Sequence, residues 1–280
     1  MIKLLALDID GTLLKKDYSL SEKVKTAVKA ASFLGVKVVL VTGRMHSAAT
    51  FIADELGLDT PILTYSGALA RYKDEIFYEK SIPGVLVKEV LTELKKFDTQ
   101  VNLYFHDELY SETETPVLID YCQKRKLNYI IKPFDEIENI HATKILSIGK
   151  TLEETTEVLE YLQKKFENEL CVVRSLPIFC EIINKEASKG NAILFMAKKW
   201  GIAPQEIMAI GDQDNDIELL KVAAVKVAMG NASEGLKAVA TYVAPSVEED
   251  GVAVAIEKFI LLKGESFLDE NDTRLGEKNV

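Results

Sequence analysis

The sequence predicts an α/β protein, a doubly wound parallel sheet with an inserted α+β domain. Short, wholly apolar runs alternate with amphipathic helical segments near both ends of the chain. This is the order of parallel strands joined by crossover helices. The middle of the chain alternates apolar and polar residues more strictly, which suits a sheet with one exposed face. With 280 residues, the chain is long enough for two modest domains.

The first segment predicts strands and helices in turn. Lys3–Leu7 is a short apolar run, typical of a strand buried on both faces. Ser21–Gly35 has helical periodicity, and Gly35 ends the helix. A strand at Val36–Val41, a helix in SAATFIADELG and a strand–turn–strand unit in PILTYSGALARY are expected next.

The inserted domain is expected at residues 83–187. The predicted helices are Val85–Phe97, Thr115–Lys126 and Leu152–Phe166, and the predicted strands are VNLYFHDELYS, TKILSIG, CVVRS and FCEIIN.

The first pattern returns from residue 188, so the parallel-sheet domain is predicted to comprise residues 1–82 and 188–262. A helix from Gly190 to Gly201 precedes EIMAIGD, a buried strand that ends in an acid. The remaining predicted elements are a helix at Ile217–Val222, a strand in VKVAMGNA, a helix in SEGLKAVA, a strand in TYVAP and a helix in GVAVAIEKFILL. Residues 263–280 are polar and aperiodic, and we expect them to be disordered or loosely attached.

Composition excludes some partners. The formal net charge of −10 argues against duplex nucleic acid or an anionic membrane as the main partner. No apolar run approaches the ~18 residues of a membrane span. The first ten residues turn acidic too soon for a signal peptide. Cys122, Cys171 and Cys180 are far apart and odd in number, as expected for reduced thiols in a cytoplasmic protein.

Polar residues gather where three predicted strands end. They are Asp8, Asp10 and Thr12 after the first strand, Thr42, Gly43 and Arg44 after the second, and Asp212, Asn215 and Asp216 after the later one. Ligands of open parallel sheets bind outside these strand ends, near the point where the strand order reverses. A strand-like backbone would point Asp8 and Asp10 the same way. Four converging carboxylates would repel one another without a cation, and oxygen ligands favour Mg²⁺.

A phosphate group fits the same strand ends. Mg²⁺ held by few carboxylates keeps coordination positions for water or substrate phosphate. The Thr42 hydroxyl can donate to phosphate, and Gly11 and Gly43 allow the backbone to approach it closely. Lys189, just before a predicted helix, adds a positive charge. Together these groups predict a phosphoryl-transfer site in which a carboxylate can be the nucleophile.

Four sequence motifs carry a family resemblance. DIDGTL at 8–13, VTGR at 41–44, SKG at 188–190 and GDQDND at 211–216 resemble the ordered motifs of the haloacid dehalogenase (HAD) superfamily. YSGAL, VAMGNA and EDGVA resemble its Cof-type, sugar-phosphatase subfamily, which has a class IIB α/β cap between the second and third motifs. The resemblance covers about residues 1–262. It implies a Rossmann-like core and a Mg²⁺-dependent phosphatase that hydrolyses small phosphorylated metabolites, such as sugar phosphates, through an aspartyl-phosphate.

The resemblance also implies a role for each motif residue. Asp8 would be the nucleophile and Asp10 the general acid and base. Mg²⁺ would be held by Asp8, the main-chain carbonyl of Asp10, and Asp212. The residues expected to bind phosphate are Ile9, Thr42, Gly43, Lys189 and Asn215. Asp216 would steady the metal or Lys189, and Arg44 would support the site. The subfamily usually has Asn where this chain has Ser66, so only a backbone contact is expected to survive there.

The stretch SLPIFCEIINK predicts substrate-selecting residues. In a strand, Phe179, Glu181 and Ile183 share one face, while Ile178, Cys180 and Ile182 share the other, which is expected to be cap core. An aromatic ring and an acid suit a sugar-like ring and its hydroxyls. Phe179 and Glu181 are therefore expected to sort substrates.

Each site residue also has a plain structural alternative. Asp8 and Asp10 suit a solvated strand end, Thr42 a turn, Lys189 a surface position, Arg44 a local salt bridge, Asp216 a helix N-cap, Phe179 the core and Glu181 a solvated face.

Three other functions fit the chain. A phosphomutase could use the same nucleophile and pass the phosphoryl group back to a sugar. A non-enzymatic, phosphate-responsive module of the response-regulator type also combines acids, a Thr or Ser and a Lys on a doubly wound sheet. Its acidic pair and phosphoacceptor lie on different strands, however, and it has no inserted domain. A catalytically silent binding protein is the third.

Overall fold

A computed structural model describes residues 1–262, and the chain forms two compact units. The first unit contains Met1–Leu40, Asp54–Thr60 and the described residues from Leu194 onward, 194–262. The second unit contains Val41–Ala53 and Pro61–Ile193.

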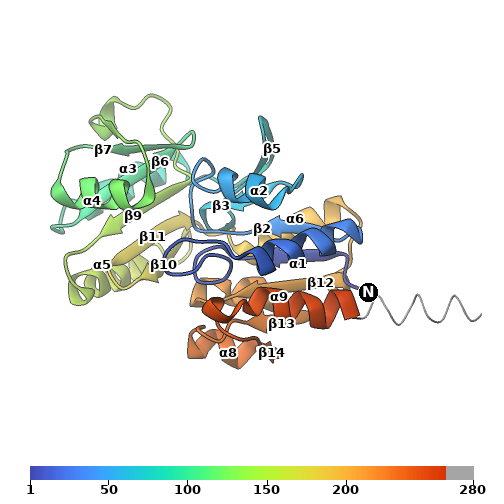
Figure 1. Ribbon diagram of the computed structural model, residues 1–280. Coiled ribbons are helices and arrows are strands. Elements are labelled where there is room, and N and C mark those ends of the chain that lie inside the picture. The colour runs from blue at the N-terminus through green and yellow to red at the C-terminus, as the bar shows by residue number, and fades with distance from the viewer. Residues whose placement is uncertain (263–280) are drawn as a thin grey trace, which may run out of the picture. The chain divides into compact units, whose positions relative to one another are not determined.

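A five-stranded parallel sheet forms the centre of the first unit (Figure 1). Its order is β14-β13-β12-β1-β2, with bounds Tyr242–Val243, Val225–Ala228, Ile207–Gly211, Leu4–Leu7 and Lys37–Leu40. All residues of β1 and β12 are buried, which explains why their sequences are apolar without alternation. The predicted doubly wound parallel sheet is therefore confirmed.

The first unit also contains four α-helices among the described residues that lie wholly within it. They are α1 (Glu22–Phe33), α7 (Ile217–Lys221), α8 (Glu234–Val239) and α9 (Gly251–Ile256), with a π-helical turn at Glu257–Leu261. The Ser21 hydroxyl caps α1 by accepting from the Val24 N–H, and Gly35 follows the helix with a φ of +83°. Helices α1 and α9 lie side by side (Figure 1). Two helices, α2 (Thr50–Leu56) and α6 (Lys189–Lys199), have residues in both units.

Two sheets form the second unit. The six-stranded sheet has the order β10-β11-β9-β6-β7-β8, with bounds Leu170–Leu176, Phe179–Asn184, Lys144–Ile148, Gln100–Phe105, Glu108–Ser111 and Ile130–Ile131. Its pairs are antiparallel except β7 with β8. The smaller antiparallel sheet is β3-β4-β5, with bounds Ile62–Thr64, Leu69–Tyr72 and Glu75–Glu79. Its helices are α3 (Gly84–Leu94), α4 (Pro116–Arg125) and α5 (Leu152–Lys165).

Both faces of the six-stranded sheet are buried in apolar clusters, which corrects the expectation of one exposed face. Cys180 and Ile182 lie in a cluster with residues of α3 and α5. Phe179 and Ile183 lie in a second cluster, which α4 and residues 45 and 65–69 complete. The predicted alternation is confirmed within β11, because Phe179 and Ile183 enter one cluster while Cys180 and Ile182 enter the other. The prediction is wrong for Ile178, which precedes the strand and packs against the cluster of Phe179 and Ile183.

Two strand predictions also need correction. VNLYFHDELYS is a hairpin rather than one strand: β6 and β7 are joined by His106 and Asp107, with φ of +52° and +59°. Left-handed backbone at both turn positions matches the twist of a tight hairpin. Strand β5 was not predicted, because its sequence EIFYE has no buried position and gives a weak pattern.

The turn of the β6–β7 hairpin contacts residues 46, 47 and 65, which explains why these segments belong to the second unit. The Asp107 carboxylate accepts hydrogen bonds from the main-chain N–H groups of His46 (2.8 Å) and Ser47 (3.0 Å) and from the Tyr65 hydroxyl (2.6 Å). Burial and the Asp107 carboxylate raise the pKa of Tyr65 well above its usual value, so the phenol stays protonated and donates. Residues 41–53 and 61–82, predicted to belong to the parallel-sheet domain, thus cluster with the inserted segment. The boundaries at residues 82 and 188 stay a prediction, and residues 263–280 lie outside the described part.

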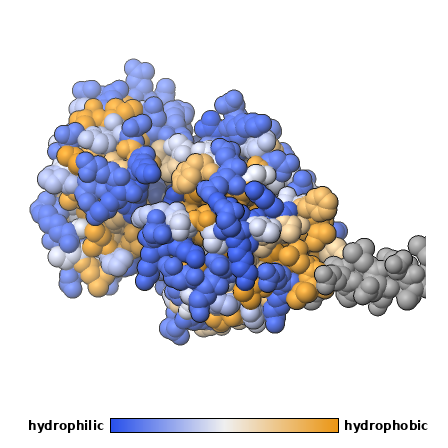
Figure 2. Space-filling model, viewed as in Figure 1, coloured by the Kyte–Doolittle hydropathy of each residue, from blue (hydrophilic) through white to orange (hydrophobic). Residues whose placement is uncertain are grey.

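Hydrophilic residues cover most of the face shown in Figure 2, and hydrophobic residues appear between them in patches. Among residues 1–262, no helix combines the length and apolar character needed to cross a membrane.

Candidate active site

The first unit brings two predicted strand ends together where the strand order reverses. Strand β1 pairs with β2 on one side and with β12 on the other, and Leu7 is in register with Ile210. The Asp8 N–H extends this pairing by donating to the Ile210 carbonyl (3.1 Å). Asp8 and Asp212 therefore follow neighbouring strands at the carboxyl edge of the sheet, which is the usual ligand position in open α/β sheets.

Three carboxylates converge at this edge. Oxygen atoms of Asp8, Asp212 and Asp216 lie within 4.8 Å of one another, and the three side chains are 5 %, 3 % and 0 % exposed. Buried like charges at such distances repel each other strongly. The set offers only hard oxygen donors, which fits a divalent cation such as Mg²⁺.

The turn after β12 directs the Asp216 carboxylate. Its Oδ2 accepts from the main-chain N–H groups of Asp212 (3.0 Å) and Gln213 (3.2 Å). A Cβ at Gly211 would lie 2.6 Å from Asp216, so the strand must end on glycine. Asp216 occupies the N-cap position of α7 but makes no side-chain capping bond to that helix. The alternative that Asp216 serves only to cap α7 therefore does not describe its contacts, which are with the N–H groups of the preceding turn.

Asp212 contacts the loop after β1. Its carboxylate accepts from the Thr12 hydroxyl (3.4 Å) and from the Gln213 side-chain amide (2.9 Å). Gly11 has a φ of +78°, and a Cβ there would lie 2.3 Å from the Asp212 carboxylate. Only glycine can therefore occupy this position.

Asp10 differs from Asp8 in its exposure to solvent. Strand β1 ends at Leu7, and the chain then turns, with the N–H groups of Leu13 and Leu14 donating to the Ile9 carbonyl (2.9 Å each). Asp8 is buried and the Asp10 side chain is exposed. Strand β1 ends at Leu7, before Asp8, and that the Asp8 and Asp10 side chains point the same way stays a prediction. Within residues 1–262, the carboxylate cluster contains Asp216 and not the Asp10 side chain.

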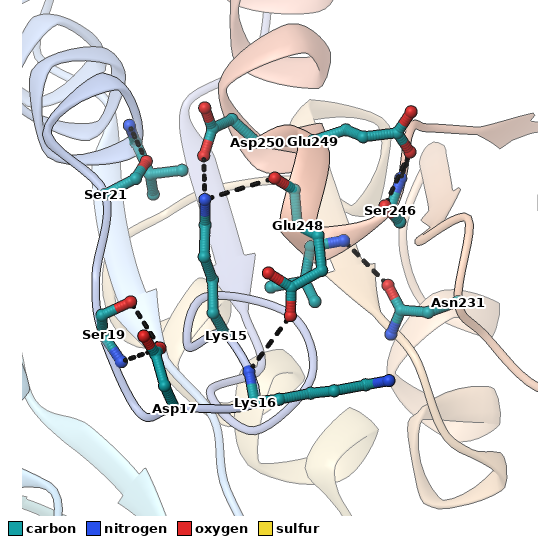
Figure 3. Close-up of polar contacts among 12 residues, drawn as sticks. Lys15, Lys16, Asp17, Ser19, Ser21, Asn231, Ser246, Glu248, Glu249 and Asp250 are labelled. Atoms are coloured by element: carbon teal, nitrogen blue, oxygen red, sulfur yellow. Dashed lines mark hydrogen bonds and ion pairs between the residues drawn. The ribbon is translucent and has the colours of Figure 1, made fainter.

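Asn231 is a site residue that the sequence reasoning missed. Its side-chain amide donates to the Gly11 carbonyl (2.8 Å), and its amide oxygen accepts from the Val247 N–H (2.9 Å). Figure 3 shows Asn231 beside the turn at Ser246–Asp250, which Lys15 and Lys16 also contact. The motif VAMGNA pointed to this position, but its contact partner lies 220 residues away in sequence.

In the second unit, Thr42 is 1 % exposed and takes part in three hydrogen bonds. Its N–H donates to the Leu63 carbonyl (2.8 Å), and its carbonyl accepts from the Ser66 N–H (2.9 Å). Its hydroxyl oxygen accepts from the Arg44 N–H (3.1 Å). The contact with the Arg44 N–H confirms that Thr42 has the structural role in a turn that was offered as its alternative. This role is compatible with phosphate binding, because the hydroxyl hydrogen can still donate.

Ser66, which replaces the usual Asn, lies at a φ of +56°, in the left-handed region that Asn tolerates better than most residues. The Ser66 N–H donates to the Thr42 carbonyl (2.9 Å).

The other predicted phosphate-binding residues occupy varied positions. Lys189 is 2 % exposed and is the first residue of α6. Asn215 is half-buried in the short 3-10 helix Asp214–Asp216. Ile9 has a wholly buried side chain, which leaves its main chain as the only part that can meet a ligand. The Arg44 guanidinium donates to the Ala48 carbonyl (3.3 Å).

The cap residues are buried. Phe179 packs in an apolar cluster, as its core interpretation states. Glu181 is 5 % exposed, so the interpretation of a solvated acid is wrong. Glu181 pairs with Lys144 (3.2 Å). The sequence analysis did not single out Lys144, although it is a lone lysine in the apolar strand TKILSIG. The charge of Lys144 within an apolar strand was the signal that could have identified it. Its partners are evident only from the folded structure.

Comparison with known proteins identifies the class. Residues 5–256 match the family described as haloacid dehalogenase-like hydrolase, so the chain belongs to that family. The resemblance seen in the four motifs is confirmed, and the chain is a phosphatase of this family.

Individual relatives span the chain. YxeH of Bacillus subtilis (strain 168), named provisionally as a phosphatase, is 33 % identical, covering 94 % of this chain and 100 % of YxeH. YcsE of the same organism, a 5-amino-6-(5-phospho-D-ribitylamino)uracil phosphatase, is 30 % identical, covering 93 % and 96 %. The structure of the HAD subclass IIB sugar phosphatase BT4131 is similar at a TM-score of 0.81 and 28 % identity, covering 92 % of this chain and 98 % of that one.

Proposed function

We propose that this protein is a Mg²⁺-dependent phosphatase that hydrolyses small phosphorylated metabolites through an aspartyl-phosphate on Asp8. The observation that carries the proposal is the buried carboxylate set of Asp8, Asp212 and Asp216. It lies at the switch point of a parallel sheet, in a chain of the haloacid dehalogenase-like hydrolase family. Phosphorylated metabolites with several hydroxyl groups are the favoured substrates, because the relatives include a sugar phosphatase and a phosphatase of a phosphoribityl compound.

We assign the metal to Asp8, the Asp10 main-chain carbonyl and Asp212, with Asp216 as a further carboxylate of the same cluster. Bound there, Mg²⁺ would neutralise the carboxylates and the phosphate oxygens, so that one anion can attack another. The Asp216 carboxylate, fixed by the N–H groups of Asp212 and Gln213, would hold the turn that presents Asp212.

The carboxylates divide the chemistry between them. Asp8 attacks phosphorus, and the bond to the leaving alkoxide breaks. Asp10 gives its proton to that alkoxide and then takes one from the water that hydrolyses the aspartyl-phosphate. The exposed position of the Asp10 side chain leaves it accessible to a leaving group and to water. Thr42, Gly43, Lys189, Asn215 and the Ile9 main chain are proposed to bind the phosphate oxygens, with Arg44 in support.

A release assay tests the proposal. A panel of phosphorylated metabolites, incubated with Mg²⁺, should yield inorganic phosphate most rapidly from sugar and polyol phosphates. Asp8→Asn should abolish release, because an amide is a very poor nucleophile, while the thermal unfolding midpoint stays near that of wild type. Asp54→Asn, an exposed acid on α2, is the matched control and should keep full activity. Release by Asp8→Asn near the wild-type rate would refute the nucleophile.

A further inference from the structure

Lys144 is a buried lysine in the apolar interior of the second unit. Its side chain is 4 % exposed, and its ammonium group donates to the Gly43 carbonyl (2.9 Å) and to Glu181 (3.2 Å). The ammonium nitrogen also lies 4.9 Å from the centre of the Tyr104 ring. These three contacts and its burial give the lysine a defined position.

Glu181 balances the charge of Lys144 and is itself held in place. Its carboxylate accepts from the hydroxyls of Ser175 (2.9 Å) and Ser66 (3.3 Å) in addition to the lysine. A buried ion pair adds little stability compared with an apolar pair of the same size. Stability alone therefore does not account for two charges in this interior. The group to which Lys144 donates, the Gly43 carbonyl, indicates what else the lysine does.

Lys144 fixes one peptide group in the loop after β2. The Gly43 carbonyl and the Arg44 N–H belong to the same planar peptide unit and point in opposite directions. Lys144 holds the carbonyl, and the Arg44 N–H donates to the Thr42 hydroxyl oxygen (3.1 Å). Turning the peptide would break both contacts. The lysine therefore determines which group the Thr42 oxygen accepts from, and this leaves the hydroxyl hydrogen to donate elsewhere.

We propose that Lys144 is a positioning residue that orients the Thr42 hydroxyl for substrate phosphate by holding the Gly43 carbonyl. The inference rests on the proposed phosphate-binding role of Thr42. Lys144 does not touch substrate in this account. Its effect passes through the Gly43–Arg44 peptide to a single hydroxyl, and the ion pair with Glu181 holds the ammonium group in place.

A double-mutant cycle tests this route. Thr42→Val removes the hydroxyl, and Lys144→Met removes the donor with little change in length. Each single variant should lower kcat/KM for p-nitrophenyl phosphate by roughly 10- to 100-fold, the range for one hydrogen bond to a charged group. In the Thr42→Val background, Lys144→Met should add less than about a twofold loss, because the hydroxyl it serves is gone.

Inorganic phosphate supplies a binding measurement. Its inhibition constant should rise in both single variants, and Lys144→Arg, which keeps a charged donor, should restore part of the loss. Lys150→Met is the matched control, because Lys150 lies in the same unit and pairs with Asp98 on the surface. It should leave kcat/KM and the inhibition constant unchanged.

The outcomes separate the possible failures. If Lys144→Met costs the same factor with and without the Thr42 hydroxyl, Lys144 acts elsewhere and the inference is overturned while the phosphatase proposal stands. If Thr42→Val is fully active, the phosphate-binding role of Thr42 is wrong and the inference falls with it. Lys144→Met leaves Glu181 buried without its partner, so a variant that fails to fold is replaced by the same cycle in the Glu181→Gln background.

Discussion

Individual carboxylates of the first unit have different surroundings, and these predict different functions. Asp8 is buried beside Asp212 and Asp216, whereas the Asp10 side chain is exposed two residues later. A buried carboxylate next to a cation suits nucleophilic attack, and an exposed one suits proton exchange with a leaving group and water.

We expect Asp10→Asn to slow both half-reactions by about 10²-fold or more, the usual contribution of a proton-transfer group. A good leaving group such as p-nitrophenolate needs less protonation, so phosphoenzyme should accumulate with that substrate. Acid-quenched, radiolabelled protein would reveal it. If the variant loses the same factor on good and poor leaving groups and no phosphoenzyme is trapped, Asp10 is not the acid and base.

The carboxylate cluster should bind Mg²⁺ in the absence of substrate. Titration calorimetry should detect binding by wild type, and Asp212→Asn should weaken it, because one buried ligand is lost. Activity should require Mg²⁺, and Ca²⁺ should inhibit. Ca²⁺ accepts six to eight ligands in looser geometry and can take up both oxygens of Asp8. Full activity in excess chelator would contradict the metal site.

At the scale of elements, the loop after β1 depends on the turn at residues 246–250. Lys15 pairs with Asp250 (3.4 Å), the Lys16 N–H donates to Glu248 (3.3 Å), and Asn231 joins the Gly11 carbonyl to Val247 (Figure 3). These contacts hold the loop that carries Asp10 and Gly11.

Asn231→Ala should therefore lower kcat by about fivefold, the value of one neutral hydrogen bond, through a misplaced Gly11. Ser246→Ala is the control, since Ser246 holds the same turn through Glu249 (2.6 Å) without contacting Gly11. Steady-state kinetics and thermal unfolding of both variants distinguish the cases. Equal losses of kcat in the two would mean that the turn, and not the Asn231 amide, supports activity.

Glu93 of helix α3 makes polar contacts with helix α5. Glu93 accepts from Lys96 (2.5 Å), Lys165 (2.8 Å) and the Tyr161 hydroxyl. Hydrogen bonds from Lys165, Lys96 and Tyr161, in that order, lower the pKa of Glu93 from 4.5 to about 2.

A depressed pKa means that the unfolded chain takes up the proton first as the pH falls. The stabilisation by Glu93 is thus complete above about pH 4.5 and is lost as the pH falls toward about 2. Glu93→Gln should unfold at lower temperature near neutral pH, and its unfolding midpoint should decline less between pH 5 and pH 2. Glu89→Gln, an exposed position on α3, should keep the wild-type slope. Parallel curves for wild type and Glu93→Gln would show that Glu93 does not contribute.

At the scale of the whole chain, local sequence patterns predicted most of the helices and strands. Wholly apolar runs marked the buried parallel strands, and the alternation along β11 marked its two faces. The same local patterns misjudged the β6–β7 hairpin, where His106 and Asp107 take left-handed backbone although neither is glycine. The face of the larger sheet that was expected to be exposed is covered by residues from distant segments, which no local pattern records.

The sequence by itself determined the family motifs and the acids at strand ends, because the positions of buried strands along the chain follow from short-range periodicity. Only the tertiary structure decided which carboxylates converge, and it brought Asp216 to Asp8 and Asp212 while Asp10 stayed exposed. It likewise paired Lys144 with Glu181 and set Asn231 on Gly11. Those contacts join segments far apart in sequence, and the pairing of strands and the direction of each turn after them bring the segments together.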